Sequence, residues 1–98
     1  MTLARYIQSP DESKDYLVDY TTWLSTGETL VTSVTAVTPV TSPVLTATTA
    51  INAALTGVVV TIAGGLVDNE YTIKLTTTTS ASQIKEDCIV MSVEAACA

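Results

Sequence analysis

The sequence predicts an all-β domain of about 6–8 short antiparallel strands, arranged as a sandwich or a barrel. β-Branched threonine and valine fill stretches such as "TLVTSVTAV" and "VVVTIA", and these residues favour extended backbone. Turn signals rich in glycine, proline and serine recur at roughly the 8–12-residue spacing typical of such folds. A chain of 98 residues has the length of one domain.

The first 14 residues are expected to form an N-terminal arm ahead of this domain. "MTLARYIQ" sets apolar Leu3, Tyr6 and Ile7 around Arg5, and "SPDESK" follows as a polar break that contains proline. The segment is too short for a core of its own, yet apolar enough to gain from contact with a neighbour. Leu3, Arg5, Tyr6 and Ile7 are therefore a candidate docking arm, and a frayed terminus is the alternative.

The first strand is expected over residues 15–24, "DYLVDYTTWL". It alternates Tyr16, Val18 and Tyr20 on one face with Leu17 and Asp19 on the other, the pattern of a half-buried strand. The turn "STGE" follows, and "TLVTSVTAV" is expected to form the next strand.

The stretch "TGETLVTSVTAVTPVT" repeats threonine at every third position. On a strand, a three-residue repeat sends successive threonines to opposite faces, so Thr29 and Thr35 are expected to oppose Thr32. Both faces then carry threonine and valine together. A left-handed β-solenoid is the alternative, but it needs several stacked repeats, and the pattern is not resumed after residue 41.

The second half of the chain is expected to add further strands. Pro39 and Pro43 end the preceding strand or place it at a sheet edge. In "VLTATTAINAAL" alanine permits a short helix, while threonine favours the strand that we prefer. "VVVTIA", which ends at two glycines, "YTIKLTTTT" and "QIKEDCIVMSVEA" are expected to be the remaining strands.

Charge and hydropathy exclude two classes of partner. Ten acidic and four basic residues give a net charge of −6, so the chain offers no basic patch for nucleic acid. Its apolar runs are interrupted too often to cross a bilayer, and its start lacks the apolar core of a signal peptide. We therefore expect no nucleic-acid or membrane partner, and synthesis in a cytosol.

The residue types needed for catalysis are also sparse. The chain has no histidine, the usual general base near neutral pH and the commonest metal ligand. Glu86 and Asp87 are expected to be solvated surface charges, and "DNE" at 68–70 to form a turn in preference to a calcium loop. No glycine-rich phosphate-binding pattern is present. We predict no catalytic residue, no metal site, no cofactor and no enzymatic activity.

The two cysteines have different expected environments. Cys88 lies inside the last predicted strand and is expected to be a buried, inert thiol. Cys97 lies in the terminal tail, residues 96–98, and is a candidate for an intermolecular disulfide if the assembled particle leaves the reducing cytosol.

Several stretches, taken in order, resemble one protein family. "KDYLVDYTTWLSTGETL" combines an aspartate-led strand, an aromatic-rich segment and a "GE" turn before a threonine-rich strand. "VVVTIAGG" and "EYTIKLTTTTSASQIKEDCIVMSV" continue the similarity. The order and spacing resemble small immunoglobulin-like structural proteins of tailed bacteriophages, often described as fiber–tail adaptor proteins. The alanine-rich middle segment and the terminal "EAACA" depart from the pattern, so the resemblance does not identify which edges bind partners.

The resemblance implies an immunoglobulin-like β-sandwich over residues 15–95. Its core would join residues of the first strand to those of two later strands. The predicted core residues are Tyr20, Trp23, Leu24, Val58, Val60, Ile62, Tyr71, Ile73 and Leu75.

The resemblance also implies a function. The protein would be a non-enzymatic component of the virion, assembled in the host cytoplasm and acting in several copies at the head–tail or tail–fiber junction. Its partners would be portal, connector, tail, fiber or capsid proteins and copies of itself. A capsid decoration protein is the alternative. A receptor- or carbohydrate-binding module is less favoured, because such modules present aromatic side chains at loop tips, whereas Trp23 is expected in a strand.

Overall fold

A computed structural model of the chain describes residues 2–95, which contain seven strands and no helix. The strands account for nearly all the segments in which threonine, valine and isoleucine dominate, because β-branched side chains pack well on a pleated surface. In chain order they are β1 (Thr2–Gln8), β2 (Ser13–Asp19), β3 (Leu30–Thr38), β4 (Leu45–Ile51), β5 (Gly57–Gly64), β6 (Asn69–Thr79) and β7 (Ile84–Val93).

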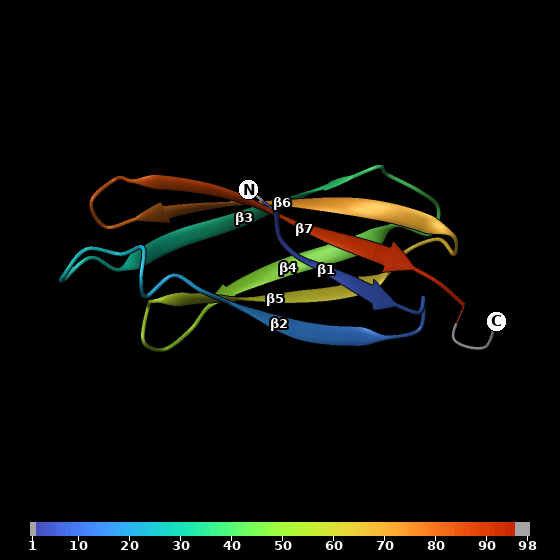
Figure 1. Ribbon diagram of the computed structural model, residues 1–98, viewed down its shortest axis with the longest axis horizontal. Coiled ribbons are helices and arrows are strands. Elements are labelled where there is room, and N and C mark those ends of the chain that lie inside the picture. Colours follow the sequence, from blue (N-terminus) through green and yellow to red (C-terminus); the bar gives the residue numbers. More distant parts are fainter. Residues whose placement is uncertain (1, 96–98) are drawn as a thin grey trace.

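The strands form two sheets that pack face to face (Figure 1). One sheet has four strands in the order β1-β7-β6-β3, and the other has three in the order β2-β5-β4. Every neighbouring pair is antiparallel except β1 and β7, which run parallel, unlike the all-antiparallel arrangement that we expected. In Figure 1, β1 lies between β7 of the upper sheet and β2 of the lower sheet.

The core lies between the sheets, and buried and non-buried residues alternate along the central strand β6. On β6, Tyr71, Ile73 and Leu75 are fully buried, while Thr72 and Lys74 between them are exposed. Residues of β5 and β7 complete the cluster, together with Leu30 of β3, Leu45 of β4 and Tyr20, which directly follows β2. Of the predicted core residues, Tyr20, Val58, Val60, Ile62, Tyr71, Ile73 and Leu75 are buried, while Trp23 and Leu24 are partly buried and pack against the cluster.

The first residues differ most from expectation. Where we expected an arm, residues 2–8 form β1, which pairs with β7 from Thr2 opposite Cys88 to Gln8 opposite Val93. The predicted boundary at residue 14 also falls inside a strand, because β2 begins at Ser13. The parallel partner of β1 lies about 85 positions further along the chain, and the strand packs Leu3 and Tyr6 against the core while Ile7 stays exposed.

The threonine repeat is accommodated by an irregularity at the start of β3. The pairing with β6 shifts between Leu30 and Thr32, so Leu30 points into the core while Val31 is exposed. Beyond the shift, Thr35 is partly buried and Thr32 and Val34 are exposed. Residues 45–51, for which a helix was the alternative, form strand β4.

Trp23 lies in a loop and not in the strand that we expected. Strand β2 ends at Asp19, whose Oδ1 accepts hydrogen bonds from the backbone N–H of Thr21 (2.9 Å) and from the Thr21 hydroxyl. A short polar side chain that bonds the backbone two residues on favours a turn. Trp23 N–H and Leu24 N–H then both donate to the Tyr20 carbonyl, at 2.9 and 3.0 Å.

Candidate partner-docking surface

Strand β1 divides its side chains between the core and the solvent. Leu3 and Tyr6 pack against the core, whereas Arg5 and Ile7 are exposed. The side chain of Ile7 is 71% exposed, a large apolar surface at the edge of a sheet. The four residues of the predicted arm therefore belong to one edge strand, with two of them anchoring it and two facing outward.

A groove separates β1 from β2, because these edge strands belong to different sheets. The groove has a volume of about 200 Å³. Its lining includes Leu3, Tyr6, Tyr16, Leu17, Val18 and Ile89, and we call it the β1–β2 groove. Ile89 is almost fully buried, so the floor of the groove is the hydrophobic core itself.

Two tyrosine rings bridge the groove between the edge strands. The centroids of Tyr6 and Tyr16 lie 4.2 Å apart with the ring planes inclined at 31°. Burial raises the pKa of the Tyr16 hydroxyl, and the nearby Tyr6 and Glu12 raise it further. The Tyr16 hydroxyl is therefore neutral at physiological pH and acts as a hydrogen-bond donor.

Gln8 accepts that hydrogen bond and closes one end of the gap between the sheets. Its Oε1 accepts from the Tyr16 hydroxyl at 3.1 Å, and its Nε2 donates to the carbonyls of Glu12 and Ile62, both at 2.8 Å. Gln8 is 2% exposed, and these contacts satisfy its buried amide group. Local sequence gives no sign of this role, because glutamine is usually found at the surface.

The outer rim of the groove is acidic. Asp15, Leu17 and Asp19 alternate along the exposed face of β2. Asp15 accepts a hydrogen bond from the Thr61 hydroxyl at 2.6 Å. Hydrogen bonds from the side chain and backbone of Thr21 lower the pKa of Asp19, which keeps this carboxylate charged at neutral pH. The rim thus carries two carboxyl groups, one on either side of an exposed leucine.

The opposite long side of the sandwich is closed. The edge strands β3 and β4 lie close together along their lengths. The Thr35 hydroxyl of β3 donates to the Ala47 carbonyl of β4 at 2.6 Å, and the Thr49 hydroxyl of β4 donates to the Ser33 carbonyl of β3 at 2.7 Å. Reciprocal hydroxyl-to-carbonyl bonds therefore tie the two sheet edges together.

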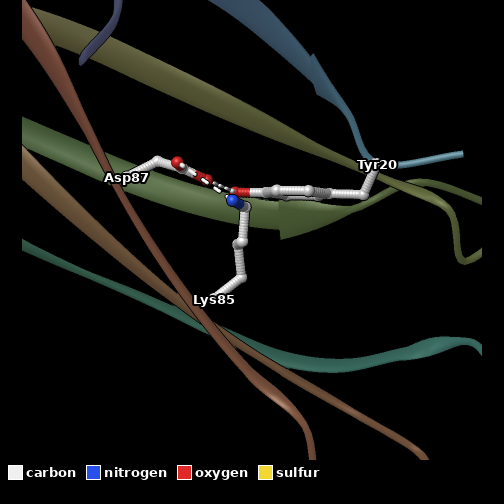
Figure 2. A network of polar contacts seen from close by, with 3 residues as sticks. All are labelled: Tyr20, Lys85 and Asp87. Carbon is white, nitrogen blue, oxygen red and sulfur yellow. Dashed lines mark hydrogen bonds and ion pairs between the residues drawn. The ribbon is translucent and has the colours of Figure 1, made fainter. Parts of the chain in front are cut away.

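A polar cluster joins the sheets near one end of the sandwich (Figure 2). The Tyr20 hydroxyl donates to Asp87 Oδ2 at 3.3 Å, and Lys85 Nζ lies 3.8 Å from Asp87 Oδ1. Asp87 is fully buried, not surface-exposed as we expected from the sequence, because Tyr20, at the start of the loop after β2, covers it. Burial, together with the charge of Asp87, raises the pKa of Tyr20 to about 12.

The loops at this end also form a shallow hollow of about 370 Å³ beside Trp23. Glu28, in its wall, is held by the Thr79 hydroxyl at 2.5 Å and the Ser25 N–H at 2.9 Å, which lower its pKa. Lys85 Nζ lies 5.9 Å from the centre of the Trp23 ring. The hollow combines satisfied polar groups with one aromatic ring, and its acid already has internal partners.

The remaining predicted sites lie apart from these features. Cys88 is a free, partly buried thiol on β7, and Cys97 lies outside the described residues. Within residues 2–95, no three metal-ligating side chains gather in one place. The same part of the chain contains no helix long and apolar enough to cross a membrane.

Comparison with known proteins identifies the family. No curated protein matches the chain. A family model described as podophage GP4 fiber-tail adaptor protein gp77 matches residues 8–92, which span β2 to β7 almost completely. The match includes β2 and its acidic rim, whereas most of β1 precedes it. Because the match covers most of its length, the chain belongs to the podophage fiber-tail adaptor family.

Proposed function

We propose that the protein is a non-enzymatic structural component of the virion, which acts in several copies as an adaptor at the tail–fiber or head–tail junction. The match of residues 8–92 to a fiber-tail adaptor family carries this proposal. Its partners would be fiber, tail or connector proteins together with copies of itself. Assembly would take place in the host cytoplasm, and the mature protein would remain in the particle.

We also infer that the sandwich is of the immunoglobulin type. The orders β2-β5-β4 and β3-β6-β7 reproduce those of the two sheets in that fold, with β1 added beside β7. The Tyr71 hydroxyl, near the start of β6, accepts a hydrogen bond from the Leu66 N–H at 2.8 Å. A tyrosine that bonds the backbone a few residues upstream at this corner is characteristic of immunoglobulin-like domains.

The docking surface would be the edge that carries β1. Leu3 and Tyr6 hold this strand on the core, which leaves Ile7 exposed to a neighbouring protein. Arg5 is also exposed, and its Nη1 lies 3.9 Å from Glu70 Oε2. An exposed apolar side chain on an unpaired sheet edge is a common feature of protein–protein contacts. Burial of Ile7 would contribute roughly 1.5–3 kcal/mol to binding at each copy.

Electron microscopy of intact particles tests the location. Density for this chain between tail and fiber, or at the connector, with a few to dozens of copies, is the expected result. Density over the capsid surface in hundreds of copies would show that the protein is a decoration protein and not an adaptor. Absence of the chain from purified particles would refute a structural role altogether.

A pair of matched substitutions tests the docking surface. Ile7→Asp should leave the isolated domain folded but reduce its incorporation into particles, because a charge then faces the partner. Ile84→Asp is the control, since Ile84 is 64% exposed at the far end of β7. Equal incorporation of the two variants into particles would show that Ile7 of β1 is not part of the interface.

A further inference from the structure

We infer that the β1–β2 groove receives an extended, cationic segment of another virion protein, which adds to the free edge of β2 as an eighth strand. This inference rests on the proposed adaptor function and names the kind of partner that the edge fits. Its first basis is the topology: β2 ends its sheet, so one side of its backbone has no strand beside it. Unpaired backbone groups at a sheet edge are a template for strand addition.

The groove supplies the apolar half of the site. A segment added beside β2 would place alternate side chains against the inward-facing row, opposite Tyr16 and Val18. These side chains would enter the hollow of about 200 Å³ between the two edge strands, above the buried Ile89. Aliphatic residues fit such a lining, because the groove presents leucine, valine, isoleucine and the faces of two tyrosines.

The rim supplies the charge selectivity. The other side chains of the added segment would lie opposite Asp15, Leu17 and Asp19 on the outer face. Opposite charges facing one another across two strands attract, and like charges repel. The favoured segment therefore has a basic residue at each end of a five-residue stretch, with aliphatic residues second and fourth.

Charge also excludes a second copy of this chain as the added strand. Two antiparallel copies of β2 centred on Leu17 would place Asp15 of each copy opposite Asp19 of the other, with four carboxylates along one seam. The net charge of −6 adds to that repulsion. Lys14 does not relieve it, because this side chain lies over the Tyr16 ring, 5.6 Å from the centroid, on the other face of the strand.

The opposite side of the sandwich makes strand addition there unfavourable. A segment entering between β3 and β4 would have to displace the Thr35–Ala47 and Thr49–Ser33 hydrogen bonds. The β3–β4 side is therefore less accessible to an added strand than β2, which lies next to an apolar groove.

Nuclear magnetic resonance titration of the isolated, isotope-labelled protein tests the inference with two synthetic peptides. The probe is acetyl-Ser-Lys-Val-Thr-Val-Lys-Ser-amide, and the control replaces both lysines with glutamates. The lysine peptide should shift the amide signals of residues 15–19 and the tyrosine ring signals, and should bind about tenfold more tightly than the control.

Variants of the protein then assign the charge selectivity. Asp15→Asn with Asp19→Asn keeps hydrogen-bond acceptors at both positions and should abolish the preference between the peptides. Asp15→Lys with Asp19→Lys should reverse it. Glu86→Lys with Glu94→Lys changes the net charge by the same amount as the lysine pair at 15 and 19, at exposed positions of another strand and the segment after it, and should leave the preference intact.

Three results would overturn the inference: equal binding of the two peptides, signal changes centred on β3 and β4, or no binding of the lysine peptide up to millimolar concentration. None of them would affect the location of the protein in the particle, which microscopy decides separately. Conversely, a capsid location with selective peptide binding would refute the adaptor function and retain the strand site.

Discussion

The two long sides of the sandwich differ in how closely their edge strands approach one another. On one side, β3 and β4 lie close together and exchange hydrogen bonds from Thr35 and Thr49 to carbonyl oxygens of the facing strand. On the other side, β1 and β2 stand apart, and Tyr6 and Tyr16 span the gap with a groove beside them. The same two sheets therefore end in a closed side and an open side.

The difference shows how a small domain restricts where it associates. Unpaired strand edges promote association, and proteins commonly cover or blunt the edges that are not used. Here threonine hydroxyls of each edge bond carbonyls of the other on the closed side, whereas a groove lined by the two tyrosines stays open between the edges on the other side. An assembly protein needs one edge that binds and others that do not.

The largest expected effect is on the core that both sides share. Ile73→Ala should lower the free energy of unfolding by about 2–5 kcal/mol, because Ile73 is fully buried at the centre of β6. Chemical denaturation of the purified domain measures this loss. A loss of unfolding free energy below about 1 kcal/mol would show that the two long sides of the sandwich are stable without the packing of Ile73 in the core.

A second effect concerns the contact that joins the sheets near the loops, away from either long side. Because the pKa of Tyr20 is raised from 10 to about 12, its contribution to stability is complete below pH 10. As pH rises from 10 to 12 the unfolded chain releases this proton first, so stability should fall by about 2–3 kcal/mol. Denaturation at several pH values measures the slope. Tyr20→Phe should remove this part of the slope, and an unchanged slope would contradict the assignment.

On the open side, Gln8→Ala should lower the free energy of unfolding by about 1–3 kcal/mol, because it removes the amide that donates to the carbonyls of Glu12 and Ile62. Thermal or chemical unfolding measures the loss. The Tyr16 hydroxyl would also lose its acceptor, so a second variant, Tyr16→Phe, should be less costly when combined with Gln8→Ala than on its own. Strictly additive losses would show that the two side chains do not act together.

The smallest expected effect is on the closed side. Thr35→Val keeps the shape of the side chain but removes the donor to the Ala47 carbonyl, which should cost about 0.5–1.5 kcal/mol. Thr32→Val is the matched control, because Thr32 is exposed on the outer face of the same strand. Equal unfolding midpoints for the two variants would show that the hydrogen bond from Thr35 to Ala47 does not stabilise the protein.

Several features of the fold were predictable because they depend on local patterns. The all-β class is confirmed, and it follows from the density of threonine and valine. The alternation at Tyr16, Val18 and Tyr20 predicted their inward orientation. The fiber-tail adaptor family is also confirmed, from the order of the same short stretches.

The strand that carries the proposed docking surface was predictable only in part. An apolar segment followed by a polar break predicted a docking role for Leu3, Arg5, Tyr6 and Ile7. The structure places all four on one strand, β1. The segment looked like an arm because its partner, β7, is distant in sequence. Gln8, buried between the sheets, gives no local signal, and neither does Asp87, whose burial depends on Tyr20 from the loop after β2.

By itself, the sequence determined most of the segments that extend and most of the apolar side chains that face inward, because these properties depend on residues within a few positions of one another. The tertiary structure decided which edges meet and which stay open. A threonine on β3 reaches a carbonyl only when β4 lies beside it, and β1 becomes a strand only when β7 supplies its backbone partners. Edge pairing across a sandwich joins residues far apart along the chain, and no local pattern encodes that distance.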